Sequence, residues 1–91
     1  MAKLAENKIR EALGKLPGWE LTPEGLRKKV EFASFPEAVR FVDRLVAPAE
    51  AAQHHPNIAV VYRYVTLILT THDEGGVTQK DLDLARAIEA L

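Results

Sequence analysis

The sequence has 91 residues, of which 12 are Lys or Arg and 13 are Asp or Glu, giving a net charge of −1. A chain of this length predicts a single domain, residues 1–91, with one hydrophobic core. The absence of Cys excludes disulfides, thiolate metal sites and thiol nucleophiles. The near-neutral charge provides no basic surface for a phosphate backbone, and no segment approaches the ~20 apolar residues of a membrane span. We therefore expect a cytoplasmic protein that contacts neither nucleic acid nor a membrane directly.

The first half of the sequence predicts a helix, a hairpin and a second helix. Apolar residues recur at helical spacing over residues 4–15, and a Pro-Gly pair at 17–18 ends this pattern. Apolar and polar residues alternate on both sides of a turn at 23–25, which is typical of a β-hairpin. Residues 34–37 fit a capping box with Pro in the first turn, so a helix is expected from residue 35 to about residue 53.

The second half predicts another hairpin and a last helix. Residues 58–62 and 64–71 are rich in Val, Ile, Tyr, Leu and Thr, which favour strands. A double glycine at 75–76 ends the second strand, and Thr78 with Asp81 signals the start of a helix. The order αββαββα predicts an α+β fold, a four-stranded antiparallel sheet with the helices packed on one face. Because the last strand is apolar on both sides, we expect a second copy of the chain to cover the other face or an edge.

Two adjacent histidines follow the second predicted helix. Glu50 precedes His54 by four residues, which predicts that the two share a helix face. One interpretation of His54 is a cation at a helix C-terminus paired with Glu50; the other is acid-base chemistry. Pro56 forces His55 into an extended conformation, so the two rings are expected to point in different directions.

A third histidine, His72, ends the last predicted strand. It is either a solvated loop residue or a group that reaches a cleft. Asp81 has an ordinary role as a helix cap, which is compatible with a second role at a site. The spacing of the histidines argues against a three-ligand metal site, and neither a phosphate-binding loop nor a nucleophile elbow is present. Proton transfer by imidazole, whose unperturbed pKa is about 6.5, is the chemistry that remains.

The ordered set of these residues resembles the pterin-4a-carbinolamine dehydratase family, which also includes dimerisation cofactors of homeodomain transcription factors. The residues that carry the resemblance are Glu50, His54-His55-Pro56, Tyr62, His72 and Asp81, with Thr71-His72-Asp73 and Gly75-Gly76 around the last histidine. The resemblance implies the same αββαββα fold, assembled as a homodimer or homotetramer. It also implies a lyase that dehydrates 4a-hydroxytetrahydrobiopterin to quinonoid dihydropterin, in tetrahydrobiopterin biosynthesis and recycling, with the pterin as substrate and no cofactor.

The resemblance also implies roles for individual residues. His54 and His72 would act as general acid and base, and His55 would bind and orient the pterin and contribute to proton transfer. Glu50 would tune His54 or hold the pterin, and Asp81 would fix His72 or the edge of the site. The remaining supporting residues would be Pro56, which shapes the loop, and Thr71 and Asp73, which flank His72.

Three positions depart from the family pattern. Members usually carry an aromatic residue at the position of Ile58 and Asn at the positions of Val60 and Arg63. These changes affect strand packing, pterin affinity and the turn, but they remove no proton-transfer group. The alternatives to the enzyme are a non-catalytic protein-interaction module, similar to a transcriptional coactivator, and a pterin-binding protein.

Overall fold

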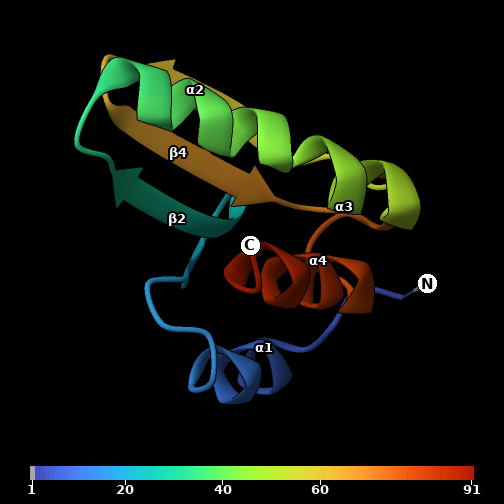
Figure 1. Ribbon diagram of the computed structural model, residues 1–91. Coiled ribbons are helices and arrows are strands. Elements are labelled where there is room, and N and C mark those ends of the chain that lie inside the picture. The colour runs from blue at the N-terminus through green and yellow to red at the C-terminus, as the bar shows by residue number, and fades with distance from the viewer. Residues whose placement is uncertain (1) are drawn as a thin grey trace.

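The computed structural model describes residues 2–91 and contains one sheet, four α-helices and a 3-10 turn (Figure 1). In chain order the elements are α1 (Glu6–Leu13), β1 (Glu20–Thr22), β2 (Gly25–Glu31), α2 (Phe35–Arg44), α3 (Val46–Ala52), β3 (Asn57–Val61), β4 (Tyr64–Leu69), η1 (His72–Glu74) and α4 (Gln79–Glu89). None of the helices within residues 2–91 has the length and apolar character to cross a bilayer.

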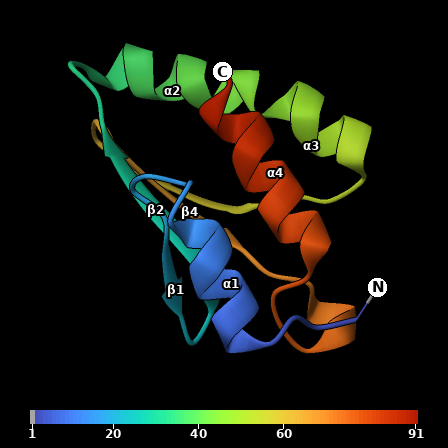
Figure 2. The same ribbon diagram turned by 90° about the horizontal axis from the view of Figure 1, so that it is seen from below.

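The four strands form an antiparallel sheet in the order β1-β2-β4-β3. The helices lie on one side of this sheet, and α4 runs between α1 and the α2–α3 pair (Figures 1 and 2). The predicted α+β architecture is thus confirmed. Strands β3 and β1 are the two edges, and the end of the central strand β4 leads directly into η1 and α4, where the candidate residues His72, Asp73 and Asp81 lie.

The core lies between the helices and one face of the sheet. Along β4, Val65, Leu67 and Leu69 are fully buried, whereas the residues between them are only half-buried on the opposite face. This alternation follows from the two-residue period of a strand. The core is completed by Ile9, Leu16, Trp19, Leu26, Ala38, Phe41, Leu45, Val77, Leu82, Leu84, Ala85 and Ile88.

The predicted single helix over residues 35–53 is wrong, because the structure divides it at Leu45 into α2 and α3. Pro48 explains the division. Proline has no N–H to donate to the carbonyl four residues before it, that of Arg44, and its ring crowds that carbonyl. The chain instead makes a tighter turn, in which the N–H of Leu45 donates to the carbonyl of Val42 at 3.0 Å. Helix α3 therefore starts afresh, with Pro48 in its first turn, where proline is tolerated.

Helix α3 ends in a motif that fixes the direction of the chain at the adjacent histidines. Gln53 adopts the left-handed conformation with φ of 50°. The N–H of Gln53 donates to the carbonyl of Glu50 at 3.2 Å, and the N–H of His54 donates to the carbonyl of Ala49 at 3.1 Å. This pair of bonds is a Schellman motif. The turn takes His54 off the helix, so its side chain is directed by the loop and not by the helical period.

Candidate functional site

The two imidazoles of the adjacent histidines have different carboxylate partners. His54 Nε2 lies 2.5 Å from Asp81 Oδ1, and this contact is nearly closed to solvent, with side-chain exposures of 12% and 0%. His55 Nε2 lies 2.5 Å from Glu50 Oε2, and both of these side chains are exposed by more than 60%. The sequence-based expectation that the rings point in different directions is thus confirmed.

Two of the expected pairings are wrong. Glu50 was expected on the same helix face as His54, but it contacts His55, because α3 ends at Ala52 before the helical period reaches either histidine. Asp81 was expected to fix His72 or the edge of the site; of these, the pairing with His72 is wrong, since Asp81 contacts His54. The end of α3 and the start of α4 pack against each other, which brings His54 to the first turn of α4.

Asp81 is held by the start of α4. The predicted capping box is present: the backbone N–H of Thr78 donates to Asp81 Oδ2 at 2.9 Å. The hydroxyl of Thr71, just after β4, donates to the same oxygen at 2.9 Å. A carboxylate in the first turn of a helix also lies near the positive end of the helix dipole. Asp81 therefore combines the role of a helix cap with that of a fully buried acceptor for His54.

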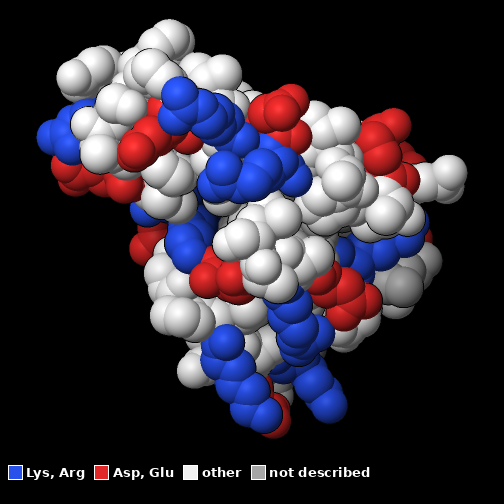
Figure 3. Space-filling model, viewed as in Figure 1, with Lys and Arg blue, Asp and Glu red and all other residues white. Residues whose placement is uncertain are grey.

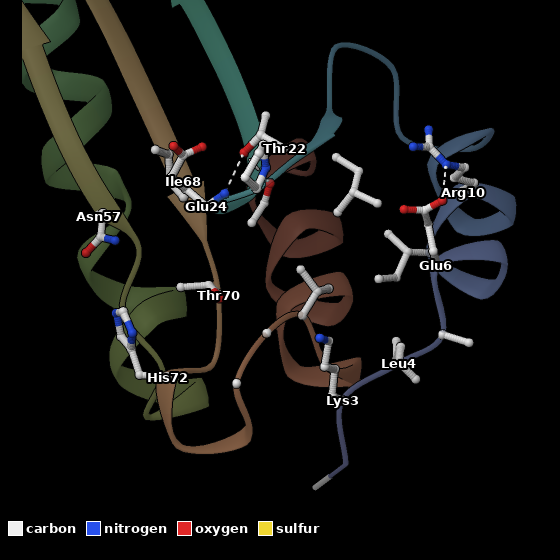
Figure 4. Close-up of a pocket in the computed structure, with 18 residues that line it drawn as sticks. Lys3, Leu4, Glu6, Arg10, Thr22, Glu24, Asn57, Ile68, Thr70 and His72 are labelled. Carbon is white, nitrogen blue, oxygen red and sulfur yellow. Dashed lines mark hydrogen bonds and ion pairs between the residues drawn. The ribbon is translucent and has the colours of Figure 1, made fainter.

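His72 lies on a different surface, where it lines a cleft of about 940 Å³. It begins η1 and is exposed, and its ring points toward Asn57 and lies near Thr70 (Figure 4). On the other side of the cleft lie the N-terminal segment and α1, with Lys3 and Arg10 among the labelled side chains (Figure 4). His72 is thus an exposed residue that also lines a cleft, so both interpretations drawn from the sequence remain open.

Among the cleft residues that the sequence-based interpretation missed are the two polar residues nearest His72 in the view of Figure 4, Asn57 and Thr70. Asn57 pairs with Ile68 in the β3–β4 ladder, and Thr70 directly follows the end of β4. The signal that could have found them is the alternation along β4. Every second residue of this strand is buried in the core, so the residues between them face the other side of the sheet. The polar residues that follow the strand indicate that this side is open to solvent at its end.

A second, smaller cavity of about 190 Å³ lies between the α2–α3 region and the start of β3. It is mostly apolar, and its lining includes Val42, Val46, Pro56 and Ile58, with the His55–Glu50 pair at the same site. Ile58, one of the departures from the family pattern, is thus a wall of this cavity.

The structure does not gather all the candidate residues around one point. His55 and Pro56 line the small cavity, His72 lines the large cleft, and His54 lines neither of them. Asn57, only two residues after His55, lines the large cleft, so residues 55–57 run from one cavity to the other. Asp73 is exposed in η1 and lines neither cavity.

The charges on one face of the molecule do not form a large single-sign field. On the face seen in Figure 3, basic and acidic side chains are interspersed. Within residues 2–91, no group of three or more His, Asp and Glu side chains converges in an arrangement that could hold a metal ion. The arrangement therefore provides two imidazole groups, those of His55 and His72, beside clefts of small-molecule size, and a third, that of His54, held by a buried carboxylate.

Comparison with known proteins defines the class to which this fold and site belong. A family model described as pterin 4 alpha carbinolamine dehydratase matches residues 2–91. Two relatives that carry the family's name are similar over nearly all of both chains. One, from Cyanothece sp., is 48% identical over 97% of this chain and 91% of its own; the other, from Acidobacterium capsulatum, is 46% identical over 100% and 99%. The chain belongs to the pterin-4a-carbinolamine dehydratase family.

Solved structures agree with this assignment. A protein from Brucella melitensis, described as a transcriptional coactivator/pterin dehydratase, is 34% identical with a TM-score of 0.90, over 97% of this chain and 96% of its own. A pterin dehydratase-like protein described as a RuBisCO assembly factor in the alpha-carboxysome is 27% identical with a TM-score of 0.62, over 79% and 83%. Proteins with this fold are thus described both as dehydratases and as partners of other proteins.

Proposed function

We propose that this protein dehydrates a pterin-4a-carbinolamine, that is, a 4a-hydroxytetrahydropterin, to a quinonoid dihydropterin and water. The observation that carries the proposal is the buried contact of His54 Nε2 with Asp81 Oδ1 in a member of this family. The names of relatives at 46–48% identity support the choice of substrate.

The reaction needs one proton donor and one proton acceptor. The C4a–O bond breaks as the hydroxyl leaves with a proton as water, N5 of the pterin loses its proton, and a double bond forms between C4a and N5. Substrate and product differ by one molecule of water, so the balance requires no oxidant, reductant or cofactor. Proton transfer by a positioned imidazole contributes typically ~10²–10⁴ in rate.

We assign the base to His54, which lines neither cavity but directly precedes the cavity-lining residues 55–57, and the acid to His72 in the large cleft. A carboxylate that accepts the Nε2 proton of His54 leaves Nδ1 as the nitrogen that takes up a proton, and the same carboxylate stabilises the imidazolium that results. His72 donates to the leaving hydroxyl from the cleft, where Asn57 and Thr70 provide polar groups for the pterin ring. His55, held by Glu50, orients the substrate from the adjoining small cavity.

The pathway and location form part of the same proposal. A carbinolamine of this kind arises where a tetrahydropterin is consumed by a hydroxylase, so the enzyme would act in tetrahydrobiopterin recycling in the cytoplasm. Its product is then the substrate of a reductase that regenerates the tetrahydropterin.

The decay of freshly generated 4a-hydroxytetrahydropterin, followed by ultraviolet absorbance, tests the proposal. We expect the protein to accelerate the decay over buffer, and His54→Ala or His72→Ala to reduce the acceleration by about ten-fold or more. Lys80→Ala, on the exposed side of α4, is the control and should leave the rate unchanged. A decay rate equal to that in buffer would refute the proposal.

We also propose that the protein forms a homodimer or homotetramer. Strand β3 pairs with β4 on one side only, and all five of its residues are exposed. An exposed edge strand presents unpaired N–H and C=O groups to another strand. Light scattering at micromolar concentration should give at least twice the monomer mass of 10.1 kDa, and Val61→Lys should lower it, whereas the control Glu24→Lys should not. A monomer mass would overturn this proposal.

A protein-interaction role is the second candidate function. Phe35, Val39 and Val46, all in the α2–α3 pair, are each exposed by 45–56%, and Val46 also lines the small cavity. Large apolar side chains gathered on a surface favour contact with a protein. The coactivator and assembly-factor descriptions of the solved relatives support this candidate. If it is correct, Val39→Glu abolishes partner binding while His54→Ala preserves it; the reverse pattern excludes it.

A further inference from the structure

A chain of hydrogen bonds runs from the N-terminus of α4 to His54. Asp81 is fully buried, and its Oδ1 contacts His54 Nε2 at 2.5 Å. Its Oδ2 accepts from the Thr71 hydroxyl and from the Thr78 backbone N–H, both at 2.9 Å. The carboxylate is thus held by three separate segments: the loop after α3, the end of β4 and the cap of α4.

The positions of the hydroxyl protons follow from counting donors. Thr71 has a single hydroxyl proton, and it is donated to Asp81 Oδ2. The oxygens of the Thr71 and Thr78 hydroxyls are 2.9 Å apart. Since the Thr71 proton is already used, Thr78 must be the donor in this contact. The order of donation is therefore Thr78 to Thr71 to Asp81.

The carboxylate at the end of this chain sets the tautomer of His54. An ionised carboxylate only accepts hydrogen bonds, so the proton between His54 and Asp81 belongs to Nε2. Nδ1 is then the nitrogen with the free lone pair. The hydrogen bond at one ring nitrogen of an imidazole sets its tautomer and its orientation. A carboxylate that rotated, or that lost its own hydrogen-bond donors, would therefore hold the Nε2–H tautomer of His54 less strictly.

We propose that Thr78 is a positioning residue for His54, acting through Thr71 and Asp81, and that its hydroxyl proton keeps His54 in the Nε2–H tautomer. The importance of this tautomer for catalysis rests on the proposed function, but the tautomer itself does not. As a helix cap, Thr78 provides an acceptor oxygen to the first turn of α4. The proposed positioning role uses the hydroxyl proton of Thr78 instead. Capping and positioning therefore depend on different atoms of the same side chain.

Three substitutions separate positioning from capping. Thr78→Val removes both the cap and the proton, and Thr78→Ser retains both. Thr71→Val breaks the same chain of hydrogen bonds without changing the capping residue of α4. Thr66→Val is the control, because Thr66 lies on β4 but on the face away from the core.

The measurement is the ¹⁵N spectrum of the histidine rings, together with kcat and KM for decay of the carbinolamine. In the unaltered protein and in Thr78→Ser and Thr66→Val, we expect His54 in the Nε2–H form. Thr78→Val and Thr71→Val should show a mixture of tautomers and a kcat lower by roughly ten-fold, with KM nearly unchanged.

The two measurements distinguish a failure of the proposed function from a failure of the positioning role. If the unaltered protein does not accelerate the decay, the proposed function fails, and the tautomer measurement still decides the role of Thr78. If both valine variants keep the tautomer of the unaltered protein, the positioning role is overturned, whatever their melting temperatures. Because Thr78 is proposed to act through Thr71, an unchanged tautomer in Thr71→Val alone overturns the role even if Thr78→Val does not fold.

Discussion

His54 and Asp81 are 27 positions apart in the sequence, yet Nε2 of the first lies 2.5 Å from Oδ1 of the second. The contact joins the end of α3 to the start of α4. The Schellman motif at Gln53 fixes the backbone of His54, and the capping box with Thr78 fixes that of Asp81. Two helix termini thus hold an imidazole against a buried carboxylate.

Asp81→Asn is expected to reduce kcat by about 10–100-fold, because an amide cannot stabilise the imidazolium of His54 as a carboxylate does. Stopped-flow measurement of carbinolamine decay provides the test. Asp83→Asn is the matched control, since Asp83 lies on the same helix but is exposed and contacts Gln79 and Arg86. Equal rates for the two variants would contradict a special role for Asp81.

Glu50→Gln should leave the free energy of unfolding nearly unchanged. Both members of the Glu50–His55 pair are exposed by more than 60%, and ion pairs of this kind contribute about 0–1 kcal/mol. We expect the free energy of unfolding to change by less than ~0.5 kcal/mol. Urea denaturation checks this value; a loss of several kcal/mol would mean that the pair has a structural role that its exposure does not indicate.

Gly25→Ala should destabilise the protein more than Gly75→Ala. Both glycines have positive φ, at 134° and 76°, so a side chain at either position is strained. A Cβ at Gly25 would also lie 2.3 Å from the carbonyl oxygen of Leu69, whereas one at Gly75 meets nothing within 4 Å. We expect a loss of about 1 kcal/mol at Gly75 and of more than ~2 kcal/mol at Gly25. Equal losses in thermal unfolding would show that the contact with Leu69 is relieved by local movement.

Pro48→Ala should lengthen the helical segment across Leu45, since alanine restores an N–H that can donate to the carbonyl of Arg44. Amide hydrogen exchange should then show protection of residue 48. The backbone chemical shifts should have helical values at every residue from α2 through α3. If the break persisted in this variant, packing against the sheet would be its cause and Pro48 only compatible with it.

Local signals predicted the fold well. The capping box at Thr78 and Asp81 and the alternation along β4 both act within a few residues, and the structure contains both. The break at Leu45 was missed although its cause, Pro48, is visible in the sequence. The apolar stripe continues across this position, and a continuous stripe predicts one helix.

The site could be predicted only in part. The sequence identifies which imidazoles and carboxylates are available, and it predicted that His54 and His55 diverge. It could not assign their partners, because the left-handed conformation of Gln53 ends the helical period just before them. The contact of His54 with Asp81 depends on the packing of α3 against α4, and no local pattern encodes that packing.

A double-mutant cycle on His54 and Asp81 tests the central claim most directly. If Asp81 serves the reaction by holding His54, then adding Asp81→Asn to His54→Ala should reduce kcat for carbinolamine decay no further than His54→Ala alone. If the two substitutions instead multiply their separate losses, the residues act independently, and the buried contact is not part of the catalytic machinery.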